Sequence, residues 1–256
     1  MTRNALHTDA VFSDVDDADV QDIDDFIYLM SHDVRASVRA LTELPQWIAE
    51  DLAEAGVEMS GPVGQTIEMM NRHTARLDRM LVDLLAYSQV GRMQDVARID
   101  INAALNEVLA GLPLPDGMRL VRDTECSHLV MGTQDMGMLW SALISNAVKH
   151  HHSETGTICI STKAEGPLIR LSVSDDGPGI AEKHYAKAIG AMTTLRPRDD
   201  VEGSGMGLAS VRKIAAHYGG HLELSRASQD QGGLRVDVLL PQVPETFAKF
   251  NSNGAK

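Results

Sequence analysis

The stretch GSGMGLASVRKIAAHYGG, residues 203–220, places glycines at alternate positions directly before an amphipathic segment. Gly203, Gly205 and Gly207 lead into Met206–Tyr218, where apolar residues recur with helical spacing, so we expect a helix there. Backbone N–H groups at a helix N-terminus are unpaired and lie at the positive end of the helix dipole, which favours a bound phosphate. The motif is neither a Walker loop, which needs GK[ST], nor a Rossmann fingerprint at the start of a βαβ unit.

A second glycine cluster, DDGPGI, occupies residues 175–180 and follows the β-rich run LIRLSVS at 168–174. It supplies Asp175, Gly177 and Gly179 at alternate positions. One glycine-rich loop is weak evidence for a binding site, because glycine also serves turns and bulges. Two such clusters in one chain strengthen the indication of a phosphate-bearing ligand.

A third element lies on the segment LWSALISNAVKHH, residues 139–151, inside a helix predicted over Gln134–His150. Asn146, Lys149 and His150 are spaced i, i+3 and i+4, so they share one helix face. An amide oxygen is a suitable Mg²⁺ ligand, and a lysine can meet phosphate charge. An isolated Asn in a helix is more often a solvent-facing residue. The histidines at 150–152 lack companion ligands at fixed spacing, and we interpret them as surface residues.

The N-terminal part of the chain shows apolar residues in a heptad pattern, which predicts two long helices joined as an antiparallel hairpin. The first stripe consists of Ile23, Ile27, Met30, Val34, Ser37, Leu41, Leu44 and Ile48, and the second of Val63, Ile67, Met70, Thr74, Leu77, Leu81, Leu84 and Ser88. The turn-rich stretch AGVEMSGPVG joins them, and Pro45 should kink the first helix. One such hairpin cannot bury both sides of its stripe, so we expect a dimeric four-helix bundle.

His32 occupies the f position of this heptad pattern, which points away from the stripe, and Asp33 is its neighbour. An outward histidine is reachable by another molecule, and the adjacent acid could orient the ring or take its proton. Taken alone, a surface histidine beside an aspartate usually has no function.

Composition limits the classes of protein that this chain can belong to. Its 256 residues are 43% hydrophobic and 23% charged, which is typical of globular proteins. The net charge of −13 argues against nucleic acid or an anionic membrane surface as the main partner. No apolar run is long enough for a membrane span, and the two cysteines, Cys126 and Cys159, form no disulfide framework. We therefore expect a cytoplasmic protein without a membrane span.

The pattern divides the chain into five parts. An acidic leader covers 1–19, the helical hairpin 20–91, a polar linker 92–98, a mixed domain 99–243 and a loose tail 244–256. In the mixed domain we expect helices near Asn102–Ala110, Gln134–His150 and Met206–Tyr218, and strands near Thr157–Thr162, Ile169–Ser174, Leu222–Ser225 and Leu234–Leu239. Strands grouped with helices without regular βαβ alternation predict an α+β two-layer sandwich.

The order of these elements resembles the catalytic core of HisKA-type sensor histidine kinases over residues 20–241. The hairpin with its outward histidine is followed by the Asn helix, the DxGxG cluster and the GxGxG cluster, and this joint order is far more specific than any one motif. The second half is similar to the Bergerat (GHKL) type of ATP-binding fold shared with gyrase, Hsp90 and MutL. The resemblance implies a two-component histidine kinase with ATP and Mg²⁺ as cofactors.

The resemblance also implies roles for individual residues. His32 would be the phosphoacceptor and Asp33 the general base. Asn146 would hold Mg²⁺ through the ATP phosphates, Lys149 would contact phosphate, and Asp175 would accept the adenine amino group. The remaining nucleotide-binding residues would be His150, Gly177, Gly179, Gly203, Gly205, Gly207 and Leu208. Residues 181–202 would form a mobile lid, in which Ile189 and Met192 replace the family's aromatic pair.

The family further implies a response-regulator receiver domain as partner, a homodimer formed through the hairpin, and a linker that lets the ATP-binding domain swing. No sensor-sized segment precedes residue 20, so we expect either that the chain is part of a longer protein or that a separate sensor or upstream sensory partner delivers the input. Two alternatives remain open at this point. One is a histidine phosphotransferase or scaffold whose ATP-like domain is not catalytic, and the other is a serine kinase or ATPase on the same nucleotide fold.

Overall fold

The computed structural model describes residues 17–57, 61–92, 94–112, 114–151, 153–195, 203–228 and 232–243, with the backbone alone for 17–23 and 32. Most of the predicted acidic leader, the predicted tail from residue 244 and part of the predicted lid lie outside these residues. None of the described helices is both long enough and apolar enough to span a membrane.

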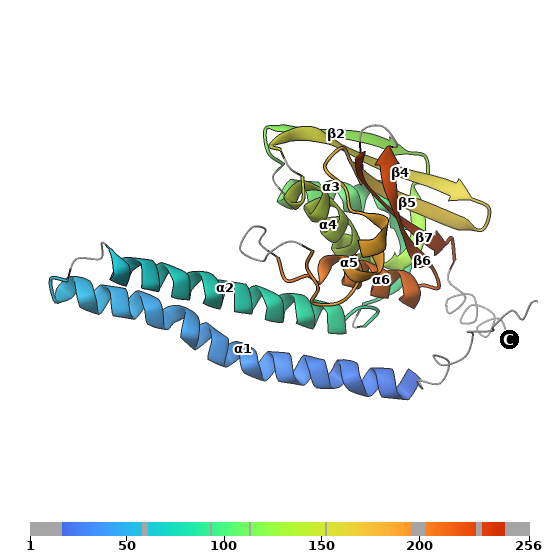
Figure 1. Ribbon diagram of the computed structural model, residues 1–256. Helices are drawn as coiled ribbons and strands as arrows, with labels where there is room; N and C mark the ends of the chain where they lie inside the picture. The colour runs from blue at the N-terminus through green and yellow to red at the C-terminus, as the bar shows by residue number, and fades with distance from the viewer. Residues whose placement is uncertain are drawn as a thin grey trace, which may run out of the picture.

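Two long helices, α1 (Asp17–Glu54) and α2 (Pro62–Ser88), run side by side in opposite directions, which confirms the predicted hairpin (Figure 1). Helix α2 begins at Pro62, where the missing N–H costs nothing because a first-turn N–H has no partner inside the helix. Helix α1 continues through Pro45, and its ribbon bends part-way along (Figure 1). The proline therefore does not end α1.

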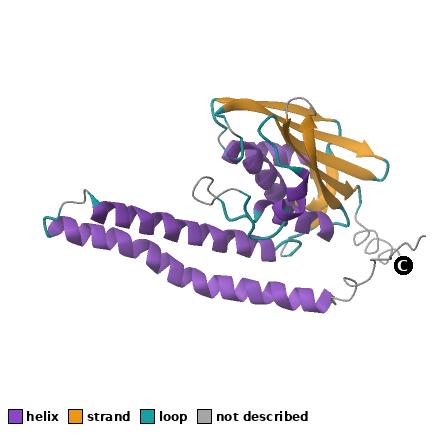
Figure 2. Ribbon diagram, in the orientation of Figure 1, coloured by secondary structure: helices purple, strands orange, loops and turns teal. Residues whose placement is uncertain are grey.

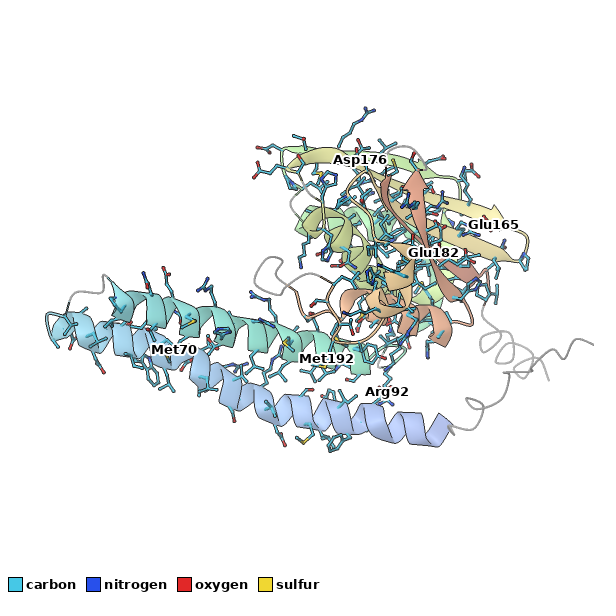
Figure 3. The ribbon with its side chains drawn as sticks, in the orientation of Figure 1. Met70, Arg92, Glu165, Asp176, Glu182 and Met192 are labelled. Atoms are coloured by element: carbon cyan, nitrogen blue, oxygen red, sulfur yellow. The ribbon has the colours of Figure 1, made fainter. Side chains whose placement is uncertain are left out.

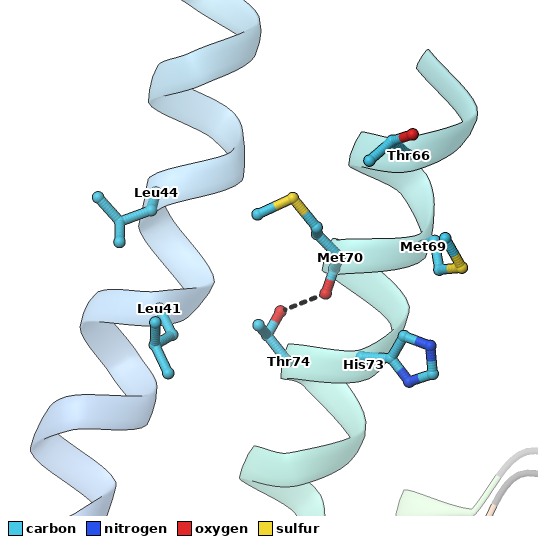
Figure 4. Close-up of a pocket in the computed structure, with 7 residues that line it drawn as sticks. All are labelled: Leu41, Leu44, Thr66, Met69, Met70, His73 and Thr74. Atoms are coloured by element: carbon cyan, nitrogen blue, oxygen red, sulfur yellow. Dashed lines mark hydrogen bonds between the residues drawn. The ribbon is translucent and has the colours of Figure 1, made fainter. Parts of the chain in front are cut away.

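The contact line between α1 and α2 differs from the predicted stripe. The described residues of α1 that are buried are Asp24, Ser31, Val38 and Pro45. They repeat every seven residues. Each lies four residues after one member of the series Val20, Ile27, Val34 and Leu41. Most described members of the predicted stripe stay exposed, for example Met30 (48%), Leu41 (46%) and Leu44 (41%). Leu41 and Leu44 also line an apolar groove between the helices, opposite Met70 and Thr74 (Figure 4). One line of α1, with both polar and apolar residues, is thus buried, and the predicted apolar stripe is left largely exposed.

The second half of the chain forms a five-stranded sheet of order β2-β4-β5-β7-β6. Its strands are β2 (Gly117–Thr124), β4 (Thr155–Glu165), β5 (Leu168–Asp175), β6 (His221–Ser228) and β7 (Gly232–Pro241). Strand β2 pairs with β4 in parallel, and the other neighbours are antiparallel. A separate antiparallel pair joins β1 (Val96–Asp100) to β3 (His128–Gly132).

Three helices cover one face of the sheet, namely α3 (Ile101–Gly111), α4 (Thr133–Lys149) and α6 (Gly207–His217). Figure 2 shows them as a layer between the sheet and the hairpin. Their apolar sides meet inward-facing strand residues in one core, centred on side chains such as Leu139, Trp140, Ile160, Leu171 and Ile214. The predicted two-layer α+β sandwich is therefore confirmed, with its predicted helices and strands in place. The dimeric bundle predicted for the hairpin goes beyond a single chain.

The predicted linker 92–98 is wrong at its C-terminal end, because Val96–Arg98 belongs to strand β1 and pairs with Val130–Gly132. The segment looks polar because only Val96 and Ile99 of the five residues of β1 are partly buried, and the other three are exposed. Strands β2 and β3 were not expected either. Strand β2 lies at the edge of the sheet and its side chains are mostly exposed. Strand β3 has only five residues, too few for a clear alternation, although Leu129 and Met131 are buried.

Residues before β1 are also held against the sandwich. The carboxylate of Asp135 at the start of α4 accepts hydrogen bonds from Gly91 N (3.1 Å) and from the Tyr218 hydroxyl (2.7 Å). That hydroxyl accepts in turn from Gly132 N at 2.9 Å. The side-chain oxygen of Gln94 accepts from the backbone N–H groups of Gln134 and Asp135, which start α4. The segment expected to swing is therefore fixed to the sandwich in this structure.

The end of the hairpin contacts α6 through one lysine. The Lys213 ammonium lies 2.8 and 2.7 Å from the two carboxylate oxygens of Asp24 in α1. It also donates to the Tyr87 carbonyl at the end of α2 (2.9 Å) and lies 4.4 Å from the centre of the Tyr87 ring. Arg92 pairs with Asp25, so a second cation contacts the same part of α1 (Figure 3). Both helices of the hairpin are thus connected to the sandwich.

The Asp135 contacts predict a stability effect. Tyr218→Phe removes a hydroxyl that bonds both a buried carboxylate and a backbone N–H, so we expect the free energy of unfolding to fall by about 1–3 kcal/mol. Urea unfolding followed by circular dichroism measures the change, with Tyr28→Phe on exposed α1 surface as the control. Equal stability of the two variants would show that this hydroxyl contributes nothing to the fold.

Candidate functional site

Asp175, the predicted adenine-binding acid, is the last residue of β5. Its Oδ1 accepts a hydrogen bond from Gly177 N at 2.9 Å, and Leu234 N lies 3.4 Å away. Burial raises the pKa of this carboxyl, and the two backbone donors act in the opposite direction. A half-buried carboxylate held by its own loop presents a defined acceptor, as recognition of an amino group requires.

The glycines of the DxGxG cluster are required by close contacts. A Cβ on Gly177 would lie 2.9 Å from Asp175 Oδ1. Gly179 has a φ of +67°, and its Cβ would lie 2.7 Å from the Gly233 carbonyl on β7. Gly233 itself passes close to the Asp175 carbonyl, where a Cβ would lie at 1.9 Å. The loop after β5 can therefore pack against β7 only because these positions carry no side chain.

Asn146 and the second glycine cluster meet in space. A Cβ on Gly207, the first residue of α6, would lie 3.2 Å from the Asn146 amide nitrogen and 3.4 Å from its oxygen. The Asn146 side chain therefore lies against the N-terminus of α6, where unpaired N–H groups favour an anion. Lys149 ends α4 and His150 follows it, both exposed, while Leu208 packs against the core.

Within the predicted lid, a 3₁₀ turn (Glu182–His184) leads into the short helix α5 (Tyr185–Ala188). Gly205 approaches Thr193 so closely that a Cβ would lie 2.6 Å from its carbonyl, and Gly205 has a φ of +76°. Gly203 has open space around its Cβ position. The second glycine cluster thus supports the last described part of the lid on one side and the Asn146 amide on the other.

The described site extends across the sandwich. In Figure 3, Asp176 lies on the side of the sandwich away from the hairpin, whereas Met192 of the lid lies on the hairpin side. His32 belongs to α1, but its side chain is outside the described residues. Asp33 is exposed on α1. The structure therefore places Asn146 against Gly207 and Gly205 against Thr193, and it holds Asp175 by its own loop, while the predicted acceptor His32 lies on α1.

Sequence reasoning missed two residues at the site, His151 and Asp176. His151 was interpreted as a surface histidine, but its side chain is 2% exposed and lies 2.9 Å from Asp176 Oδ1. This correction follows from packing, because Gly156 and Gly177 leave room for the ring. The signal available in the sequence was the second acid of DDGPGI, which needs a partner when it lies beside Asp175. Among the described residues no group of three or more His, Cys, Asp or Glu could hold a metal ion, so the His150–His151 pair forms no such centre.

The close contact at Gly177 predicts a loss of nucleotide binding. In Gly177→Ala the new methyl group must displace the Asp175 carboxylate, and we expect the Kd for adenine nucleotides to rise about tenfold or more, about 1.4 kcal/mol. Gly137→Ala in α4 is the matched control, because its Cβ meets open space. Displacement of a fluorescent nucleotide measures both, and equal affinities would remove Asp175 from the binding site.

Comparison with known proteins agrees with this geometry. Residues 133–244 match the family described as "Histidine kinase-, DNA gyrase B-, and HSP90-like ATPase". The chain is 27% identical over 233 residues to the sensor-like histidine kinase SenX3 of Mycolicibacterium smegmatis, covering 86% of this chain and 58% of SenX3. The chain spans 27%, 58% and 42% of the length of the first three curated relatives that it matches.

Solved structures of histidine kinases share the fold. Full-length ShkA in complex with AMPPNP aligns with a TM-score of 0.63 at 19% identity, covering 86% of this chain and 46% of ShkA. ThkA in complex with the response regulator protein TrrA aligns with a TM-score of 0.59 at 17% identity, covering 89% of this chain and 65% of ThkA. These findings confirm the predicted resemblance to the catalytic core of HisKA-type histidine kinases, and residues 133–244 match the ATPase family that histidine kinases share with DNA gyrase B and HSP90.

Proposed function

We propose that this chain transfers the γ-phosphoryl group of ATP to His32 and then to an aspartate of a response-regulator receiver domain. The observation that carries the proposal is the contact between the Asn146 amide and Gly207 at the start of α6. It joins the Asn helix and the second glycine cluster into one phosphate-facing edge, and Asp175 supplies the adenine acceptor at the end of β5. The histidine kinase relatives support the same activity.

The residues present fit an ATP-bound Mg²⁺ ion. The Asn146 side chain is partly exposed and offers a hard oxygen ligand beside a helix N-terminus. Mg²⁺ in nucleotide sites keeps several waters and uses substrate phosphates as ligands, so one protein oxygen suffices. We assign Asn146 to hold the ion, which would neutralise phosphate charge, and Lys149 and the N–H groups of α6 to contact the phosphates.

The proposed transfer forms a nitrogen–phosphorus bond at the His32 imidazole and breaks the bond between the γ-phosphorus and the β–γ bridging oxygen. ADP leaves with the electron pair of the broken bond. Asp33 would orient the ring and accept the proton that the attacking nitrogen loses in the overall reaction. The protein's contribution is positioning and charge neutralisation, as in phosphoryl transfer generally.

We further propose that the chain works as a homodimer. The uncovered apolar line on α1, which includes Met30, Val34, Leu41, Leu44 and Ile48, is 38–48% exposed in a single chain. A second hairpin packed against this line would complete a four-helix bundle. The response regulator is assigned as partner because the structural neighbour ThkA is seen with the response regulator TrrA.

The acceptor assignment predicts the fate of labelled phosphate. His32→Gln should abolish incorporation from γ-labelled ATP without changing nucleotide affinity, because the nucleotide residues lie on the other domain. His73→Gln, an exposed histidine on α2, should keep full labelling. The wild-type label should be lost in acid and survive alkali, as expected for a phosphoramidate. A His32→Gln protein that is still labelled would place the acceptor elsewhere, and an unlabelled wild type that binds ATP would favour the scaffold alternative.

The dimer proposal predicts the effect of a charge on the uncovered line. Leu41→Glu buries an unpaired carboxylate in the proposed bundle, at a cost of about 3–5 kcal/mol, and should shift the chain toward monomer. Leu29→Glu, also on α1 and 62% exposed, lies off the line and should leave the dimer intact. Sedimentation equilibrium distinguishes the two, and a Leu41→Glu dimer as tight as wild type contradicts the assignment.

A further inference from the structure

The side chain of His151 occupies a built slot beside the proposed adenine site. Its Nε2 lies 2.9 Å from Asp176 Oδ1, and its Nδ1 lies 2.8 Å from the Ser153 carbonyl. A Cβ on Gly156 would lie 2.4 Å from Nε2, and one on Gly177 would lie 3.2 Å from Cδ2. The ring is thus enclosed between the start of β4 and the loop that follows Asp175.

The Nε2 atom faces the Asp176 carboxylate, which favours the imidazolium form. The Nδ1 atom lies 2.8 Å from the Ser153 carbonyl, to which a protonated Nδ1 donates, and 3.2 Å from the Ser153 backbone nitrogen, whose N–H a neutral Nδ1 accepts. The Asp176 carboxylate also accepts from Thr157 N at 2.8 Å, and the Nε2–H bond gives it a second donor. A ring protonated on both nitrogens donates to Asp176 and to the Ser153 carbonyl, whereas a ring that is neutral at Nδ1 accepts from the Ser153 N–H and loses the bond to the carbonyl.

The charges around the ring act in the same direction. Burial lowers the pKa of His151, but the hydrogen bond to Asp176, the Ser153 carbonyl and the charges of Asp176 and Asp175 outweigh it, so the pKa is raised above its ordinary value. Burial raises the pKa of Asp176, but the Thr157 N–H and His151 outweigh it, so that pKa is lowered. The two charged groups named here, Asp175 and Asp176, thus lie at the end of β5 and directly after it.

We propose that the His151 imidazolium is a positioning residue that holds the Asp175–Gly177 loop in its nucleotide-binding form, so that adenine-nucleotide affinity depends on protonation of this histidine. The inference rests on the proposed ATP site and adds a regulator of its affinity. Its action on the ligand passes through Asp176 and Gly177, since Asp176 follows Asp175 directly and Gly177 N donates to the Asp175 carboxylate.

The sign of the pH dependence follows from linkage. The imidazolium is fully present below the ordinary pKa of a histidine and is lost as the pH rises through the raised pKa of His151. Affinity should therefore be highest at mildly acidic pH and fall on the alkaline side. If binding raises the pKa of His151 by one unit, the Kd changes about tenfold across the titration.

The test is calorimetric titration of the full chain with Mg²⁺-ADP from pH 6 to 9, each in two buffers of different ionisation enthalpy. The wild type should bind more tightly at pH 6 than at pH 9 and take up a fraction of a proton near the pKa of His151. His151→Gln, which is uncharged at every pH, should remove both effects and leave only the titration of ADP itself. His128→Gln, an exposed histidine on β3, is the matched control and should behave as wild type.

A second variant keeps the inference testable where His151→Gln does not fold. Asp176→Asn keeps the shape of the partner and removes its charge, so the loss of affinity should begin at lower pH than in the wild type. The imidazole NMR titration of His151 should move with it. A uniform loss of affinity at all pH values in His151→Gln, with the wild-type pH profile retained, would assign a merely structural role and overturn the inference.

The proposed function fails in a different way. A folded wild-type chain that binds no adenine nucleotide between pH 6 and 9 overturns the ATP site and this inference together. Binding that is tight but independent of pH overturns the inference alone.

Discussion

The buried carboxylate of Asp135 fixes how the two halves of this chain are connected. It lies at the start of α4 and bonds Gly91, just after the hairpin, and Tyr218, just after α6. Because a buried carboxylate left without donors is costly, these contacts form together or not at all. The packed part of the ATP-binding domain thereby includes Val90, whose side chain is buried in its core. In this structure Val90, Gly91 and Gln94 are therefore held against the sandwich.

The glycines of this fold serve two purposes that a sequence cannot separate. Gly207 approaches the Asn146 amide at a helix N-terminus, where a phosphate would be favoured. Gly179 and Gly205 approach backbone carbonyls of β7 and of the lid, so they are needed before any ligand arrives. Gly156 gives room to an imidazole ring. A glycine-rich motif is therefore as much a description of how segments pack as of what they bind.

The sequence predicted the elements whose apolar residues have regular spacing or whose ends are marked by glycines. The hairpin follows from heptad spacing, and α6 from three glycines ahead of an apolar stripe, because both patterns come from local geometry. What it missed depends on distant residues. Strand β1 is visible only through its pairing with β3, and the burial of His151 only through glycines that come from two other segments.

The heptad period of α1 is confirmed, and a single chain leaves the predicted stripe largely exposed. The residues that face α2 within one chain, such as Ser31 and Val38, lie beside the predicted stripe. A helix in a bundle contacts more than one neighbour, so its apolar surface is wider than one line of residues, and period alone does not say which part faces which neighbour. The Asn146–Gly207 contact, by comparison, could be anticipated only from the family resemblance.

The Lys213 contact makes the ATP-binding domain sensitive to the relative alignment of two helices. Its ammonium is bound at the same time by a carboxylate of α1 and a carbonyl of α2. Both hydrogen bonds can therefore form only when the two helices have one particular alignment. A helix advances about 1.5 Å and turns about 100° per residue, so a slip of α1 by a single residue would carry Asp24 out of bonding range. A small sliding or rotation of α1 would therefore break the bond between Asp24 and Lys213 of α6. The first residue of α6, Gly207, lies against Asn146.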